Sequence, residues 1–163
     1  MPPKPSQVSA SDMLEIHRQK QRLDALFKAA GTLTDAEMQS HWSRYLCVLV
    51  SGFLENSVEL CLSEFSRRHA HPEVADYVSA KLQGFHNPKM NAILELFGAF
   101  SVEWRAKLES ATDGQLSDSV NSIVGNRHRI AHGESVSLTM SSLSAYYKDA
   151  LAVVAMLEET CGV

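Results

Sequence analysis

The most constraining feature of this sequence is a long segment, residues 34–71, that contains no proline. Its apolar residues recur every three or four positions, which is the period of an α-helix. Thr34 followed three residues later by Glu37 resembles a capping box, so Thr34 is the expected N-cap. The segment therefore predicts one helix of about 36 residues, against an average of about 11–12 in globular proteins. The residues that carry this period are Trp42, Leu46, Leu49, Phe53, Val50, Leu54, Val58, Leu62 and Phe65.

Helical periodicity continues on both sides of this segment. Pro72 and Pro88 each stand where a proline suits the first turn of a helix, and Gly133 is a suitable residue to end one. No run of alternating apolar and polar residues predicts a strand. The sequence therefore predicts an all-α helical bundle with one long helix and a C-terminal amphipathic helix. The expected flanking helices cover residues 11–31, 72–83, 88–110, 113–131 and 139–159.

The domain organisation follows from composition. Residues 1–9 hold three of the five prolines and predict a disordered tail, and residues 10–163 predict a single helical domain. The N-terminus lacks the apolar run of a signal peptide. The longest nearly uncharged apolar stretch, residues 46–54, is far shorter than the roughly 20 residues that span a bilayer. We therefore expect no membrane association.

Cysteine and charge content narrow the functional classes. Cys47, Cys61 and Cys161 are odd in number and form no C-x-x-C pair, which argues against a disulfide framework and favours a cytoplasmic location with the thiols as core filler. Fifteen Lys and Arg against 19 Asp and Glu give a net charge of −4. This excludes a protein that holds nucleic acid by a coat of basic residues, but not a small basic site.

The densest cluster of functional groups is residues 125–133, where Arg127, His128, Arg129 and His132 stand close together after Asn126. The planar guanidinium of arginine matches phosphate oxygens. Histidine titrates nearest to neutral pH, so it can both accept and donate a proton. Together these groups supply what metal-independent cleavage of a phosphodiester needs: charge neutralisation at phosphorus and proton transfer at the attacking and leaving oxygens.

Helix geometry leaves alternatives open for this cluster. In a regular helix Arg127 and His132 lie about 140° apart around the axis, so they meet only if the helix ends or distorts near Ala131, or if a second chain contributes. His128 and His132 are four residues apart and share one face, which is also the spacing of metal ligands. Arg129 stands where the zinc-protease form needs Glu and would repel a cation. The cluster could equally be a solvated basic helix end, which suits the helix dipole.

The segment from Arg127 to Gly133 resembles the signature of the HEPN superfamily, in which an Arg is followed after four to six residues by a His. Ile130, Ala131, His132 and Gly133 resemble an R-N-x-I-A-H-G run, with His128 where Asn is more usual. Residues 50–58 resemble the long second helix of the RiboL-PSP-like branch, as does the stretch 87–89 that leads into an apolar helix. The resemblance extends over roughly residues 35–160.

This resemblance implies a HEPN-like helical bundle that forms a homodimer with two motifs facing one cleft. It also implies a metal-independent endoribonuclease that uses the RNA 2′-hydroxyl as nucleophile and needs no cofactor. Arg127 would then bind the scissile phosphate, His132 would act as general acid or base, and His128 would be the polar helper. Bacterial members often act as toxins or defence effectors with a neutralising partner, an antitoxin or regulatory protein. The alternatives are a catalytically silent module that binds a nucleotide or a protein, and a metal-binding regulator.

Two further groups allow two interpretations each. Glu55 lies in an apolar stretch, where a carboxylate is costly unless paired. It would either orient Arg127 or an active-site histidine, or lie on a polar face with Glu59. Glu55, Asn126 and Arg129 are the expected supporting residues of the site. The basic cluster of residues 67–71 either decorates a helix C-terminus or contacts an RNA backbone.

Overall fold

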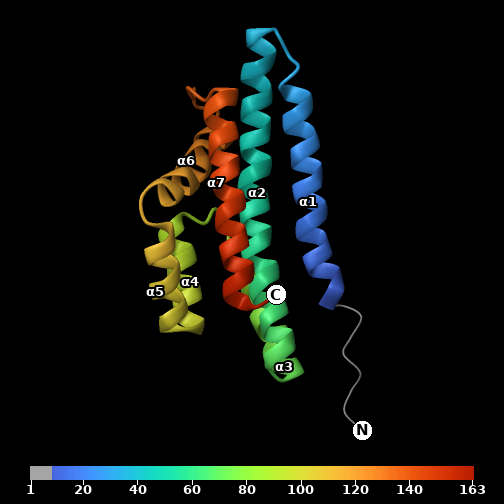
Figure 1. Ribbon diagram of the computed structural model, residues 1–163, viewed down its shortest axis with the longest axis vertical. Helices are drawn as coiled ribbons and strands as arrows, with labels where there is room; N and C mark the ends of the chain where they lie inside the picture. The colour runs from blue at the N-terminus through green and yellow to red at the C-terminus, as the bar shows by residue number, and fades with distance from the viewer. Residues whose placement is uncertain (1–8) are drawn as a thin grey trace.

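A computed structural model describes residues 9–163, and these form an all-α bundle (Figure 1). The predicted tail, residues 1–9, lies outside the described residues except for Ser9, which begins α1. Helices α1, α2 and α7 run along the long axis of the molecule, with α3 at one end and α4 and α5 paired on one side (Figure 1). The helices are α1 Ser9–Ala30, α2 Ala36–His69, α3 Pro72–Leu82, α4 Met90–Phe100, α5 Val102–Thr112, α6 Gln115–Ala131 and α7 Met140–Cys161.

The long helix predicted from the sequence is α2, with 34 residues, and it is the centre of the fold. It contacts α1, α3, α6 and α7, so it is apolar on several faces instead of along one stripe. By length and composition α2 could also cross a membrane, but 61% of its most apolar window is buried inside the fold. The apolar residues of α2 therefore pack largely against the helices that surround it.

The core has two parts. The larger one joins the other six helices to the centre of α2, and its fully buried side chains include Leu54, Leu62 and Phe97. The smaller one lies where α2 begins and combines Leu46 and Cys47 with Leu138 and Leu143, from the loop before α7 and from α7 itself. All three cysteines are free and buried, as expected of core filler. Burial raises the pKa of the Cys47 thiol to about 11 and that of Cys161 to about 12.

Three predicted boundaries were wrong. The N-cap of α2 is Asp35, whose side chain accepts a hydrogen bond from the Met38 backbone N–H at 2.8 Å, and not Thr34. The single helix expected over 88–110 is two, because Ser101 adopts an extended conformation between α4 and α5. Ser101 also caps α5, accepting a hydrogen bond from the Trp104 N–H at 3.3 Å. Pro88 precedes α4 rather than standing in its first turn. A single serine between two helices does not interrupt the spacing of apolar residues, so the sequence does not reveal this break.

Tyr147 of α7 fastens α1 to the core. Its ring stacks on Phe27 at 4.5 Å between centroids, and its hydroxyl donates a hydrogen bond to Asp24 Oδ1 at 2.7 Å. Partial burial alone raises the pKa of Asp24, but hydrogen bonds from Lys20 and Tyr147 outweigh it, so the pKa is lowered from 3.8. A carboxyl with a lowered pKa stabilises the fold at neutral pH, and that contribution is lost as the pH falls below 3.8 and through the lowered value.

We expect Tyr147→Phe to lower the free energy of unfolding at pH 7 by about 1 kcal/mol, because a hydrogen bond to a partly exposed charged group is lost. At a pH low enough to protonate Asp24 the difference should shrink, since the ionised acceptor is absent in both proteins. Urea unfolding followed by circular dichroism at the two pH values measures it. An equal loss at both would contradict an Asp24-linked role for the Tyr147 hydroxyl.

Candidate active site

The Arg–His cluster lies at the C-terminal end of α6. Buried Val120, Ile123 and Val124 attach this helix to α2 and α7. The helix ends in a Schellman arrangement, in which Gly133 has a positive φ of 71° and the Glu134 N–H donates to the Arg129 carbonyl at 2.9 Å. Gly133 therefore ends α6, as the sequence predicts.

His128 and His132 share an exposed face of α6, as their spacing predicts. Their ring centroids are 4.4 Å apart. His132 is the C-cap, but its N–H still donates to the His128 carbonyl at 3.1 Å, so it keeps the helical register. Within residues 9–163, no group of three or more His, Cys, Asp or Glu is arranged to hold a metal ion. The described chain thus gives the histidine pair no third metal ligand.

Arg127 lies on a different side of the helix from these histidines. Because the helical hydrogen-bond register continues as far as the His132 N–H, the two residues are about 140° apart around the axis of α6. Arg127 is half-buried and makes no hydrogen bond or ion pair with any described residue. Its guanidinium is available to an anion. Of the two routes to convergence, α6 does end at Ala131, but without a distortion that turns His132 toward Arg127; a contribution from a second chain stays a prediction.

The two residues that flank Arg127 and His128 have structural partners. Asn126 donates from Nδ2 to the Ser122 carbonyl at 2.9 Å. Arg129 pairs with Glu134 at 3.2 Å and donates to the Ser135 carbonyl at 2.8 Å. These contacts brace the end of α6 and the loop that follows it. Arg129 is therefore less available to a phosphate than Arg127.

Glu55 contacts neither Arg127 nor the motif histidines. Its carboxylate pairs with His86 Nδ1 at 2.8 Å and accepts the Asn87 N–H at 2.8 Å, where Asn87 has a positive φ of 52°. The expectation that Glu55 orients a motif side chain is corrected by these contacts: Glu55 fixes the α3–α4 loop. His86 could not be predicted as the partner of Glu55 from the sequence, since no local pattern connects two residues 31 positions apart.

The loop that Glu55 fixes also reaches α6. Asn121 Oδ1 accepts a hydrogen bond from the Met90 N–H at 2.9 Å, at the start of α4. Asn121 lies on the same face of α6 as His128 and His132, at intervals of seven and four residues. The α3–α4 loop therefore borders the face that carries the histidines, although it holds no contact with them.

The second basic cluster, residues 67–71, is neutralised within the fold. Buried Glu64 accepts hydrogen bonds from Arg68 Nε at 2.6 Å and from Arg67 Nη2 at 3.3 Å. Arg67 also pairs with Asp12 of α1, and His71 pairs with Glu73. Two of its cations thus connect α2 to other parts of the chain. This favours the structural interpretation over contact with RNA.

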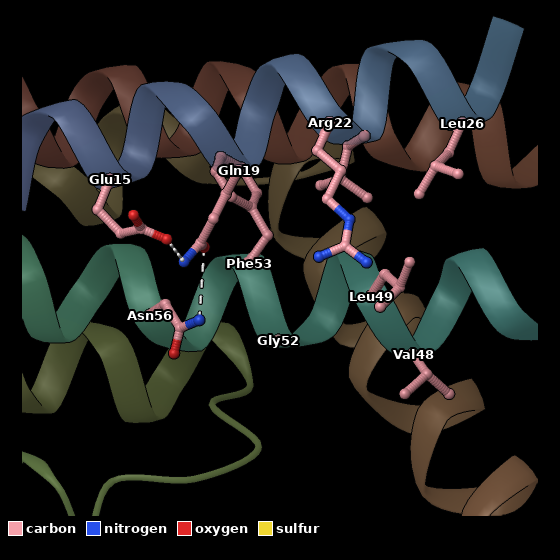
Figure 2. A pocket seen from close by; sticks show the side chains of 10 residues that line it. Glu15, Gln19, Arg22, Leu26, Val48, Leu49, Gly52, Phe53 and Asn56 are labelled. Carbon is pink, nitrogen blue, oxygen red and sulfur yellow. Dashed lines mark hydrogen bonds between the residues drawn. The ribbon is translucent and has the colours of Figure 1, made fainter.

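Figure 2 shows a groove between α1 and α2, with a volume of about 270 Å³. It has a polar end, where Asn56 donates to Gln19 at 3.4 Å and Gln19 donates to Glu15 at 3.1 Å (Figure 2). A second groove of about 290 Å³ lies between the first turns of α2 and the loop before α7. Neither groove is lined by Arg127, His128 or His132. His128 and His132 are exposed and Arg127 is half-buried outside these two grooves.

The fold and the motif define a class: an all-α bundle with an Arg-x4-His motif at the end of its penultimate helix. The model of the RiboL-PSP-HEPN family matches residues 13–162, and the chain therefore belongs to that family. The match covers all of α2 to α7 and nearly all of α1, which confirms the resemblance drawn from the motif. No curated protein and no solved structure gives a significant match.

Proposed function

We propose that this protein is a metal-independent endoribonuclease of HEPN type that acts as a homodimer. Three features support the proposal: the family, the exposed histidine pair, and an Arg127 without a partner among the described residues at the same helix end. Arg127 carries most of the argument. A half-buried guanidinium that has no carboxylate beside it is suited to an external anion such as a phosphate.

The reaction follows from the chemistry of these groups. A histidine removes the proton of a ribose 2′-hydroxyl, and the 2′-oxygen forms a bond to the adjacent phosphorus. The bond from phosphorus to the 5′-oxygen breaks, and that oxygen takes a proton from a second acid. The products are a 2′,3′-cyclic phosphate and a 5′-hydroxyl. Arg127 stabilises the negative charge that develops on the phosphate oxygens.

A dimer brings an Arg127 and a His132 side chain together. A single chain holds Arg127 and His132 on different sides of α6, whereas two facing copies bring Arg127 of one protomer near His132 of the other. Two copies form two such composite sites, each with Arg127 of one protomer and the histidine pair of the other. His128 then orients the phosphate or His132. Single-stranded RNA is the expected substrate class, because in-line attack needs a flexible backbone.

A catalytically silent binding module is the second candidate. The observation in its favour is that Arg127 and His132 do not meet within one chain. The presence of Arg127, His128 and His132 together favours the enzyme. For the enzyme we propose a cytoplasmic role as a toxin or defence effector, restrained by an antitoxin or regulatory protein.

We expect the purified protein to cleave single-stranded RNA at an unchanged rate in EDTA, and His132→Ala to lower that rate by about 10²–10⁴, the usual contribution of a general acid or base. Gel analysis of end-labelled RNA, with identification of the cyclic phosphate, measures both effects. His17→Ala, which removes an exposed histidine of α1, is the matched control and should cleave normally. Intact RNA of several types with the wild-type protein would refute the nuclease, and loss of cleavage in EDTA would indicate a metal enzyme.

A further inference from the structure

Arg44 of α2 is a half-buried arginine with an unsatisfied donor. Its Nε atom is buried and has no hydrogen-bond partner, and the side chain makes no ion pair with any residue from 9 to 163. Leaving a buried donor unpaired destabilises a fold, and more so where the group is charged. A position that retains this cost is a candidate for a ligand that supplies the acceptor.

Contacts on both sides of Arg44 place it at the junction of α2 and α6. One turn further along α2, Cys47 Sγ donates to the Ile123 carbonyl of α6 at 3.5 Å. Just before it, Ser43 donates to the carbonyl of Leu138, in the loop that follows α6, at 2.9 Å. The C-terminal half of α6 and the loop after it therefore approach the first third of α2.

The Cys47–Ile123 contact relates the positions of Arg44 and Arg127 along the two helices. Arg44 lies one turn before the Cys47–Ile123 contact on α2, and Arg127 lies one turn after it on α6, toward the same end of the bundle. Both arginines thus lie about one turn from the same α2–α6 contact, although they are 83 residues apart in the chain.

Neither arginine has an acidic residue that could neutralise it from its own helix. The residues three and four positions away are Ser40, His41, Cys47 and Val48 for Arg44, and Ile123, Val124, Ile130 and Ala131 for Arg127. Arg67 and Arg68 show the opposite arrangement, since both use Glu64 at these spacings.

We propose that Arg44 binds a second backbone phosphate of the RNA, next to the phosphate that Arg127 holds. This rests on the proposed function and names a binding residue that the Arg-x4-His motif does not contain. Two arginines that each grip one phosphate give an acidic protein a local affinity for the RNA backbone.

The test measures binding separately from cleavage. The probe is a fluorescent single-stranded RNA with 2′-O-methyl groups throughout, which cannot be cut by 2′-hydroxyl attack. We expect Arg44→Gln to weaken its binding about tenfold and to reduce the slope of log K against log salt by about 0.7, the value for one phosphate contact on a single strand. Arg105→Gln, a half-buried arginine of α5 that lies away from the end of α6, is the matched control and should bind as wild type.

Two further measurements, of folding and of phosphate binding, accompany the RNA-binding test. Thermal melting checks that each variant folds. If Arg44→Gln does not fold, Arg44→Lys takes its place, since lysine keeps the charge but not the planar guanidinium. Arg44→Lys should bind the methylated RNA with lower affinity and an unchanged salt slope. Inorganic phosphate tests the other source of the anion: Arg44-dependent thermal stabilisation by phosphate, with RNA binding independent of Arg44, would overturn the proposal. The proposal is also overturned if Arg44→Gln binds the RNA with the affinity and salt slope of the wild-type protein. It is overturned as well if the wild-type protein does not bind the RNA.

The two proposals can fail separately. Arg44-dependent binding of the methylated RNA by a protein that cuts no unmodified RNA would refute the nuclease and retain the phosphate contact. If the protein cuts unmodified RNA but binds the methylated RNA equally well with and without Arg44, the nuclease is supported and the Arg44 phosphate contact is refuted.

Discussion

A dimer formed from one Arg127→Gln chain and one His132→Ala chain is expected to cleave RNA at about half the wild-type rate, although each variant alone is inactive. The chains are co-expressed with two different tags, and dimers that carry both tags are purified. In a two-fold symmetric dimer, one composite site of such a molecule has lost both groups and the other retains Arg127 of one chain and His132 of the other. One site of two remains complete.

This result is expected because α6 keeps its register to the end. The His132 N–H still donates to the His128 carbonyl, so no distortion of the helix turns His132 toward Arg127 in the same chain. A site built within one chain would have to close that gap of about 140°. A site built between two chains needs only that the two α6 ends face each other.

The control is a doubly tagged dimer of the Arg127→Gln chain with a chain that carries both substitutions, because neither of its sites is complete. Doubly tagged dimers of the first kind that show no more cleavage than this control would place Arg127 and His132 in the same chain. Sedimentation of a monomer at micromolar concentration would remove the composite site altogether.

Glu64→Gln is expected to have the largest effect on stability, lowering the free energy of unfolding by about 2–4 kcal/mol. Glu64 is 0% exposed and holds Arg67 and Arg68 by salt bridges of 3.3 Å and 2.6 Å. Removing one partner of a buried pair costs about 3–5 kcal/mol, because the charge left behind is uncompensated. The value here is lower, since the two arginines are 31% and 38% exposed and water screens them.

The effect should extend beyond α2. Arg67 also pairs with Asp12 of α1, and Arg68 donates to the carbonyl of Gly162, after α7, at 3.0 Å. Glu64 thus positions two side chains that connect α2 to the beginning of α1 and to the end of α7. Urea unfolding measures the loss, and Glu109→Gln on the exposed face of α5 should change stability by no more than about 0.5 kcal/mol. A similarly small change for Glu64→Gln would contradict a role for this carboxylate in holding the bundle together.

The sequence predicted the elements whose signals are local. The long helix α2 was predictable because a 3.6-residue apolar period and the absence of proline act along the chain itself. The same holds for the His128–His132 pair, which four residues of helix suffice to bring together, and for the end of α6 at Gly133. The break at Ser101 was missed, because a serine in an extended conformation does not interrupt an apolar pattern that resumes at once.

The partners of charged residues were decided by the tertiary structure. Nothing near Glu55 in the sequence indicates that it binds His86 and Asn87, and nothing near Arg44 indicates that it lies at the junction with α6. Salt bridges and hydrogen bonds depend on distances of a few ångströms, which are set only when whole helices pack. Helices and the motif were therefore determined by the sequence itself, through the regular geometry of the backbone. Which charges are neutralised, and which remain open to a ligand, was decided by how α1, α2 and α6 pack.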